Sequence, residues 1–487
     1  NAPQPAHIMY EMFFPSSTDT AFHYNGELTR DRAVLSGVEP NKLTENWFFG
    51  TYAERPNFGV CWSSAYQASC RGWGDLYFEL DCGILQPGDI FETAPTEIYQ
   101  GIFPEFSTFR SFVCQKYIDE IEPIATPIQI IPNGHNPFVS GDSFELSVKN
   151  NRNIELEGDV AVSSEMFDSQ SQHNPGGEAV AANNFAFDCT LPKNGIGQFA
   201  VDMSLVTRQI RHERALFFPR GEIRCFGEGS SLACANGALE FRADPAYSHG
   251  IYSIKFGGQE WLTNKYPNHE PYSWFSPFFG GIHTNINDLS TSMVLDEKIT
   301  AGFAEISDNF GNIWKGIRIT LEFSEWEERK GMTLHSYFLT LPGLPILCHF
   351  GKFCNNTGLY IDDEFHNRAY FDMGELTDTT ISAKYFQNLD FTIRNGTAQI
   401  GRFFDKLMRV QSKRDASLYV YSSPKGMRYS NHGGGDNKTI WYTASLSAAI
   451  PNGKEFTTAP DFYIISDQNI SKDALIDLER IEFYENN

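Results

Sequence analysis

Five side chains have the chemistry to hold a hydroxyl-rich ligand such as a sugar: Trp274, His283, His366, Arg368 and Tyr370. Aromatic rings offer flat apolar faces to the C–H groups of such a ligand, and arginine and histidine can hydrogen-bond its hydroxyls. A histidine can also exchange a proton with a substrate. The competing interpretation is structural, because aromatic rings often pack in cores and histidines are often hydrogen-bonded there.

Motifs for other chemistries are absent from the sequence. It contains no phosphate-binding Gly-x-x-x-x-Gly-Lys loop, no Gly-x-Ser-x-Gly elbow, no His-Glu-x-x-His and no Cys-x-x-Cys. The 9 cysteines are odd in number and scattered, which favours reduced thiols, with one or two disulfides as the alternative. The acidic run at residues 362–364 could bind calcium or form an acidic rim, but such runs more often form a solvated loop. We therefore predict no cofactor and no metal.

The net charge excludes two classes of partner. At −23, the chain repels phosphate backbones and anionic lipids, and no basic stripe offsets this charge. No apolar run reaches the roughly 18 residues of a membrane span. We expect neither nucleic-acid binding nor membrane insertion, and the sequence does not indicate a compartment.

The elements that position these residues are predicted to be strands. The chain has 41 Phe, 21 Tyr and 8 Trp, which favour pleated, half-buried surfaces, and its 40 Gly and 24 Pro favour frequent turns. Residues 143–149 and 199–205 alternate apolar with polar, as half-buried strands do. One helix is expected after Ser471, because Ala474, Leu475, Leu478 and Ile481 share a helical face. The predicted fold class is all-β.

Two distant segments of the sequence resemble each other. Residues 86–95 match residues 451–460 at Gly, Phe, Thr, Ala and Pro in one ungapped register (453 − 88 = 365). Both read as strand, glycine turn, strand and then Thr-Ala-Pro, and residues 49–52 match 418–421 with a small gap. The second copy lies near the end of its domain. We therefore expect the first copy to belong to the second half of another domain, completed by a preceding segment or by another chain.

Linker composition and strand pattern divide the chain into three predicted domains. Residues 1–122 form the partial domain, and a stretch with three prolines follows it. Residues 123–225 have the length and alternation of an immunoglobulin-like sandwich. Residues 226–487 form the large C-terminal domain.

Residues 226–487 resemble the galactose-mutarotase-like, or aldose-epimerase-like, β-supersandwich superfamily. The resemblance lies in residues 257–262, in the Pro- and Gly-rich residues 274–282 and in residues 365–371. It implies a full supersandwich here and, through the repeat, half of a second one at the N-terminus. It also implies that Trp274, His283, Arg368 and Tyr370 lie on a sugar-binding concave face. His366 is similar to the histidine acid of such epimerases, whereas residues 418–424 lack the carboxylate expected of the base.

Three functions follow from these observations. The first is a carbohydrate-binding or carbohydrate-processing protein. The second is a structural assembly of tandem β-modules. The third is an epimerase, lyase or hydrolase that uses His366, so whether the chain is an enzyme stays open. Glycan binding separates the first function from the second.

Overall fold

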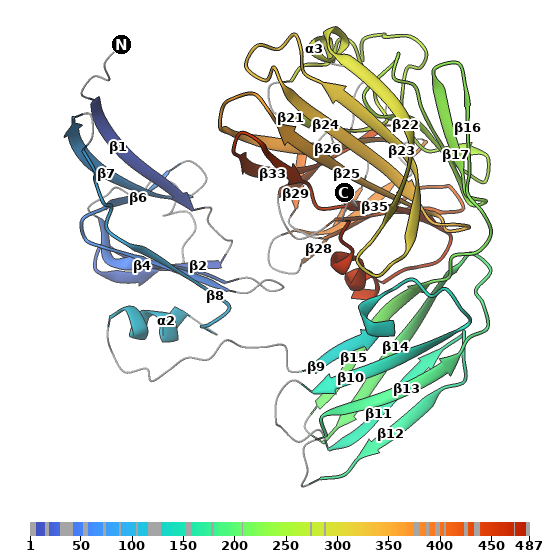
Figure 1. The fold of residues 1–487 in the computed structure, drawn as a ribbon. Helices are drawn as coiled ribbons and strands as arrows, with labels where there is room; N and C mark the ends of the chain where they lie inside the picture. The colour runs from blue at the N-terminus through green and yellow to red at the C-terminus, as the bar shows by residue number, and fades with distance from the viewer. Residues whose placement is uncertain are drawn as a thin grey trace. The chain divides into compact units, whose positions relative to one another are not determined.

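The computed structural model describes most of the chain and divides it into two compact units (Figure 1). The N-terminal unit consists mainly of Asn1–Pro127, and the C-terminal unit consists of Ile128–Tyr385 and Asp390–Asn487. The described residues are 6–14, 19–29, 42–51, 57–71, 75–86, 89–103, 106–114, 128–150, 157–176, 180–206, 208–272, 275–286, 289–374, 379–385, 389–394, 400–403, 406–422, 427–432, 439–471 and 473–483.

The N-terminal unit contains two antiparallel sheets. One has the order β1 (Ala6–Phe14), β7 (Asp75–Leu85), β6 (Gln67–Arg71), and the other has the order β3 (Glu27–Thr29), β2 (Asp19–Tyr24), β4 (Leu43–Thr51), β5 (Phe58–Trp62), β8 (Thr96–Gln100). Aromatic residues such as Phe48, Trp62 and Phe78 pack into the core. Helix α2 (Phe106–Val113) is held to β4 by the bidentate pair of Arg110 with Glu45. The hydrogen bonds from Arg110 lower the pKa of the Glu45 carboxyl to about 2.

The C-terminal unit begins with a sandwich of two sheets. Their orders are β13 (Ala182–Asp188), β10 (Ser143–Asn150), β9 (Ile128–Pro132) and β12 (Gln170–Asn174), β11 (Gly158–Ser164), β14 (Ile196–Leu205), β15 (Arg208–Phe217). Strand β10 alternates buried and exposed side chains, as its sequence predicts, and Phe144, Leu146 and Val148 face the core. The short 3-10 helix η2 (Asn133–His135) follows β9.

Two ten-stranded antiparallel sheets make up the rest of this unit. The first has the order β16 (Arg224–Glu228), β17 (Ser231–Ala235), β18 (Leu239–Ala243), β19 (Ile251–Phe256), β21 (Ile282–Ile286), β26 (Ile361–Asp372), β33 (Thr439–Ile450), β32 (Met427–His432), β29 (Ile400–Phe403), and β20 (Gln259–Glu260) pairs with β19. The second has the order β22 (Lys298–Ser307), β23 (Ile313–Glu322), β24 (Met332–Thr340), β25 (Ile346–Asn355), β35 (Asp461–Ser466), β31 (Ser417–Ser422), β30 (Leu407–Gln411), β27 (Thr380–Tyr385), β28 (Leu389–Arg394), and β34 (Lys454–Thr457) pairs with β25. Two short helices are α3 (Thr291–Asp296) and the 3-10 helix η4 (Asp473–Arg480).

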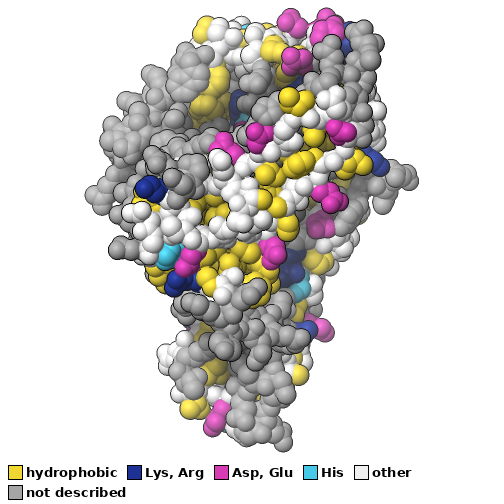
Figure 2. All heavy atoms as spheres, turned by 90° about the vertical axis from the view of Figure 1, so that its left-hand side faces the viewer, with side chains coloured by type: hydrophobic (Ala, Val, Ile, Leu, Met, Phe, Trp, Pro, Cys, Tyr) yellow, Lys and Arg dark blue, Asp and Glu magenta, His cyan; other side chains and the backbone are white. Residues whose placement is uncertain are grey.

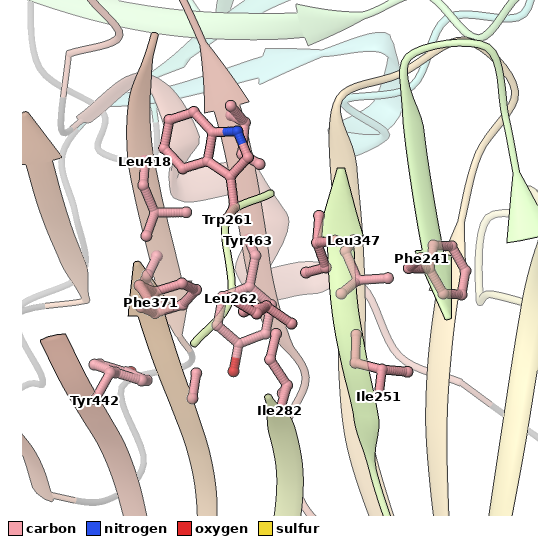
Figure 3. Packing of buried hydrophobic residues seen from close by; sticks show 14 of the residues in the cluster. Phe241, Ile251, Trp261, Leu262, Ile282, Leu347, Phe371, Leu418, Tyr442 and Tyr463 are labelled. Atoms are coloured by element: carbon pink, nitrogen blue, oxygen red, sulfur yellow. The ribbon is translucent and has the colours of Figure 1, made fainter. Parts of the chain in front are cut away.

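Side chains from both large sheets meet in one apolar core. Figure 3 shows Phe371 and Tyr442 of the first sheet packed with Leu418 and Tyr463 of the second. A chain of polar side chains also crosses from sheet to sheet: Thr284 donates to Asn367 at 2.9 Å, and Asn367 donates to Asp461 at 2.8 Å. All three are almost fully buried. Because buried polar groups are costly unless hydrogen-bonded, this chain favours one alignment of the two sheets.

Glu297 stabilises the turn after β23 and yields a testable prediction. Its carboxylate accepts hydrogen bonds from the backbone N–H groups of Ser324, Glu325 and Trp326, at 2.5, 3.0 and 2.8 Å. Burial alone would raise the pKa of this carboxyl, but these donors outweigh it and hold the pKa below 4.5. We expect Glu297→Gln to lower the free energy of unfolding by about 1–2 kcal/mol at pH 7.

The stabilising effect of Glu297 should depend on pH. A carboxyl whose pKa is depressed in the folded state stabilises it above the unfolded pKa, and this contribution is lost on further acidification. The difference between the wild type and Glu297→Gln should therefore shrink below pH 4.5 in denaturation experiments from pH 7 to pH 3. The exposed Glu325→Gln is the control. An equal difference at every pH would contradict this role.

The sheet orders show the same topology in both units. The order β1–β7–β6 matches β26–β33–β32, and β3–β2–β4–β5–β8 matches β28–β27–β30–β31–β35. At the offset of 365, Thr96 of β8 corresponds to Asp461 of β35. In this correspondence β31 is equivalent to β5, whereas residues 49–51 belong to β4. The predicted match of residues 49–52 with 418–421 is therefore wrong. The first copy also lacks the second predicted strand: residues 454–457 form β34, whereas residues 89–95 form none.

The prediction of an all-β protein is confirmed. The predicted C-terminal helix exists as the 3-10 helix η4, and Ala474, Leu475, Leu478 and Ile481 are all buried. Residues 362–364 form no loop. They belong to β26, where Asp363 pairs with Arg329. The division into residues 1–122, 123–225 and 226–487 stays a prediction.

Candidate functional site

Three neighbouring strands of the first large sheet bring four of the five predicted residues together. His283 of β21 lies opposite Arg368 of β26, and Asn285 lies opposite His366. On the other side of β26, the opposite residues in β33 are Ser445, Thr443 and Trp441. Directly opposed residues share one face of a sheet. We call this set the grid: His283, Asn285, His366, Arg368, Tyr370, Trp441, Thr443 and Ser445.

The grid lies on the outer face of the sheet, away from the second large sheet. The residues that alternate with it, such as Ile282, Ala369 and Tyr442, belong to the core between the two sheets. Because successive side chains of a strand point to opposite faces, the grid must point the other way. The inward-facing residues of these strands thus lie between the two sheets, and the grid residues lie on the opposite face.

Aromatic rings form a row along the grid. Tyr370 stacks between His283 and Trp441, with ring centroids 5.9 and 5.8 Å away and planes tilted by 25° and 15°. Phe275 and Phe278 meet Tyr370 edge-on, at 5.9 and 5.0 Å. Edge-to-face and offset arrangements are the favoured geometries of aromatic pairs. Tyr370 is therefore fixed in place, whereas the half-buried Trp441 keeps part of its surface exposed.

Polar atoms of the grid are buried but not all hydrogen-bonded. The Arg368 guanidinium lies over the Trp441 ring at 5.9 Å. Arg368 Nε, Thr443 Oγ1 and Asn285 Oδ1 have no hydrogen-bond partner within the described part of the chain. Asn285 and Thr443 are more than nine-tenths buried. Buried polar atoms are rarely left unsatisfied in native proteins, so these three atoms make the grid a candidate binding site.

Both grid histidines are neutral at pH 7. Burial lowers the pKa of His366 to about 4, with a smaller contribution from Arg368. Its Nδ1 lies 2.7 Å from Ser445 Oγ and 4.0 Å from the Glu364 carboxylate. Burial, then the neighbouring His249, holds the pKa of His283 well below 6.5. The arrangement can hydrogen-bond a neutral ligand, and its histidines would not repel Arg368.

Sequence reasoning missed half of the grid. The fifth predicted residue, Trp274, lies outside the described residues. Asn285, Trp441, Thr443 and Ser445 were not predicted, although the alternation of residues 439–445 places the last three on one face. The sequence does not predict that β33 pairs with β26, because more than 60 residues separate the two strands. The roles of His283, His366, Arg368 and Tyr370 in binding or catalysis stay predictions.

Two further features bear on possible partners. Among the described side chains, no three His, Cys, Asp or Glu residues gather in a way that could hold a metal ion. Within the same residues, no helix has the length and hydrophobicity to cross a membrane.

The fold and the grid together define an all-β protein with a mixed aromatic and polar cluster on one face of a large sheet. No protein-family model matches the chain, and no curated protein matches its sequence. Solved structures with partial similarity include a galactose mutarotase-like protein from Clostridium acetobutylicum, with 10% identity, a TM-score of 0.37 and coverage of 51% of this chain and 99% of that one. A putative aldose 1-epimerase from Escherichia coli K12 has 10% identity, a TM-score of 0.31 and coverage of 50% and 99%.

An α-galactosidase of glycoside hydrolase family 36 from Geobacillus stearothermophilus has 11% identity and a TM-score of 0.35; the match covers 51% of this chain and 41% of that enzyme. A TPR-domain-containing protein from Parabacteroides distasonis has 11% identity and a TM-score of 0.35, over 55% of this chain and 50% of that one. The chain thus spans half or less of these last two proteins. Similarity at this level assigns no family, so the grid is interpreted from its own residues.

Proposed function

We propose that the C-terminal unit binds a neutral carbohydrate on the grid. The observation that carries this proposal is the cluster of buried, unpartnered polar atoms beside an aromatic row: Arg368 Nε, Thr443 Oγ1 and Asn285 Oδ1. Sugar rings present hydroxyls and C–H faces in alternation. A site that combines hydrogen-bonding groups with flat rings is complementary to both.

The net charge of the chain disfavours an acidic ligand. Arg368 gives the grid one positively charged side chain, and both of its histidines are neutral at pH 7. Figure 2 shows acidic side chains scattered over the described part of one face of the molecule, with Lys and Arg at fewer places. The net charge of −23 would also repel acidic polysaccharides.

The same geometry weighs against proton donation by His366. An imidazolium acid must carry its second proton at the working pH, and a histidine with a pKa of about 4 is neutral and lacks that proton at pH 7. Its short hydrogen bond to Ser445 suits a residue that orients a ligand hydroxyl instead. Catalysis through His366 therefore stays the second candidate, and unchanged sugar turnover in His366→Gln would remove that residue from the mechanism.

The test is binding of immobilised neutral glycans, followed by calorimetric titration of those that bind. We expect Thr443→Val and Arg368→Met each to weaken binding by roughly 10-fold to 100-fold, because each removes a hydrogen-bonding group from a buried site. The matched control is Arg409→Met, since the Arg409 guanidinium also lies over a ring, that of Tyr419 on the other large sheet, at 5.4 Å.

Two results would overturn the proposal. One is that no neutral glycan binds to the folded protein. The other is that Arg409→Met weakens binding as strongly as Arg368→Met does, which would show a general effect on stability and no local site.

A further inference from the structure

At least two sheet edges described in the N-terminal unit, those of β8 and β1, are covered in the matching part of the C-terminal unit. In the described residues, β8 pairs only with β5, and β1 pairs only with β7. Their counterparts in the C-terminal unit have a second neighbour: β35 also pairs with β25, and β26 also pairs with β21. Unpaired edge strands expose a row of backbone donors and acceptors that can accept another strand.

The side chains of β8 are more exposed than those of its counterpart β35. All residues of β35 are buried, whereas every residue of β8 is exposed or half-buried. Ile98 is 57% exposed, and its counterpart at the offset of 365, Tyr463, is 1% exposed. Phe91 is 42% exposed, whereas its counterpart Phe456 packs against Phe365 with ring centroids 5.4 Å apart.

Ile98 belongs to the core face of its sheet. It lies directly opposite Val60 of β5, and Val60 is fully buried in the core between the two sheets of the unit. Opposed residues share a face, so the exposed surface of Ile98 marks a place where this core opens to solvent. An apolar side chain of this size costs about 1.5–3 kcal/mol when it stays exposed instead of buried.

The charges along this edge are acidic. Asp89, Glu92 and Glu97 are all exposed, and the neighbouring exposed apolar residues are Ile98, Phe91 and Ile90. In the C-terminal unit, the strand that covers the equivalent edge is β25, which runs antiparallel to β35. It places Leu347 opposite Tyr463, Phe353 opposite Phe456 and Lys352 opposite Thr457. At the offset of 365, Tyr463, Phe456 and Thr457 correspond to Ile98, Phe91 and Glu92. A strand equivalent to β25 would therefore place a leucine, a phenylalanine and a lysine opposite these three residues.

We propose that the β8 edge is an acceptor site for a polypeptide strand. The partner runs antiparallel to β8, carries apolar side chains opposite Ile98 and Phe91, and carries a basic side chain opposite Glu92. Backbone hydrogen bonds supply affinity, and the side chains supply register. This site is separate from the grid and does not depend on the proposed sugar binding.

The test uses a synthetic peptide with the sequence of Ile346–Asn355, in which Cys348→Ser and Cys354→Ser prevent thiol reactions. It is added to the 487-residue chain, and amide hydrogen exchange is measured. We expect saturable binding that slows exchange in β8 at least 10-fold, because each covered edge amide gains a hydrogen bond. A scrambled peptide of the same composition should give no protection.

Variants of the acceptor make the test specific. Ile98→Lys and Glu92→Lys should each weaken peptide binding at least 10-fold, and neither should change glycan binding. The control is Val206→Lys, since Val206 is 74% exposed and lies in the C-terminal unit. Glu92→Lys changes only an exposed charge, so it keeps the test valid if Ile98→Lys fails to fold.

The proposal is overturned if the peptide leaves β8 exchange unchanged at about 1 mM, or if the scrambled peptide protects as well. It is also overturned if sedimentation shows that two copies of the chain associate through β8, with a dimer that Ile98→Lys dissociates and the peptide does not. In that case a second copy would occupy the edge.

Discussion

Acidification from pH 7 to pH 5 is expected to lower the free energy of unfolding of the C-terminal unit by several kcal/mol. Four histidines of this unit are at least 96% buried: His249, His283, His349 and His366. Burial lowers the pKa of His249 and His366 to about 4 and that of His349 to about 3, and it lowers that of His283 well below 6.5. His249, His349 and His366 are therefore neutral in the folded protein at pH 5.

Burial explains why these rings resist protonation. His349 Nε2 lies 3.0 Å from Thr284 Oγ1, and His249 Nε2 lies 3.0 Å from the Thr284 carbonyl oxygen. The Nδ1 atoms of both rings have no partner among the described residues. A second proton would sit on these atoms, where it would add a buried charge and a donor without an acceptor.

The direction of the stability change with pH follows from the number of protons that the folded and unfolded states bind. In the unfolded chain these histidines protonate near pH 6.5, whereas in the folded protein His249 and His366 protonate near pH 4 and His349 near pH 3. Between these values the unfolded state binds more protons, so stability falls as the pH falls. His249, His349 and His366 should each lower the free energy of unfolding by about 1.4 kcal/mol per pH unit below 6.5, or by about 2 kcal/mol at pH 5.

Replacing one histidine tests this account. In His349→Gln, the slope of the unfolding free energy against pH between 6.5 and 4.5 should decrease by the contribution of one group. The control is His173→Gln, because the His173 side chain is 68% exposed. A stability that stays constant from pH 7 to pH 5 would contradict the prediction, and so would an equal slope change in both variants.

Asn236→Ala is expected to have the largest effect of any single polar substitution proposed for this protein. The Asn236 side chain is buried and makes five hydrogen bonds. Its Nδ2 donates to Thr340 Oγ1 and to the carbonyls of Leu341 and Leu344, and its Oδ1 accepts from the backbone N–H groups of Ala238 and Leu239. It thus joins the β17–β18 turn to the loop between β24 and β25, in the two large sheets.

Alanine would leave several of these buried groups unsatisfied, at about 1–3 kcal/mol each before water or neighbouring groups compensate. We expect a total loss of about 3–5 kcal/mol and a fall in the melting temperature of roughly 5–15 °C. Calorimetry is the suitable measurement because it resolves the two units as separate transitions. Asn452→Ala, which removes one bond at an exposed turn, should lower the melting temperature by a few degrees at most. Equal shifts in the two variants would contradict the prediction.

Local patterns in the sequence were sufficient to predict the class of the fold. Alternation predicted the faces of β10, and the spacing of Ala474, Leu475, Leu478 and Ile481 predicted which side of η4 is buried. These predictions succeed because side-chain direction repeats every two residues in a strand and about every three to four in a helix. The repeat was also visible, since residues 86–95 and 451–460 directly precede the corresponding strands β8 and β35.

The candidate site was only partly predictable. His366, Arg368 and Tyr370 lie on one strand, so two-residue spacing already places them on one face. Thr443 and Trp441 join them only because β33 pairs with β26, and that pairing is set by long-range hydrogen bonding and core packing. Likewise, residues 454–457 form β34 because β25 lies beside them, whereas residues 89–95 have no such neighbour and form no strand.

The sequence by itself determined the strand-rich class, the repeated ending and the chemical types of several residues of the candidate site. The tertiary structure alone decided which of those residues meet, which histidines are neutral and which edge of the repeat is left open. The physical reason is that strand alternation and composition act between near neighbours, whereas burial, hydrogen-bond partners and pKa depend on residues brought close from hundreds of positions away.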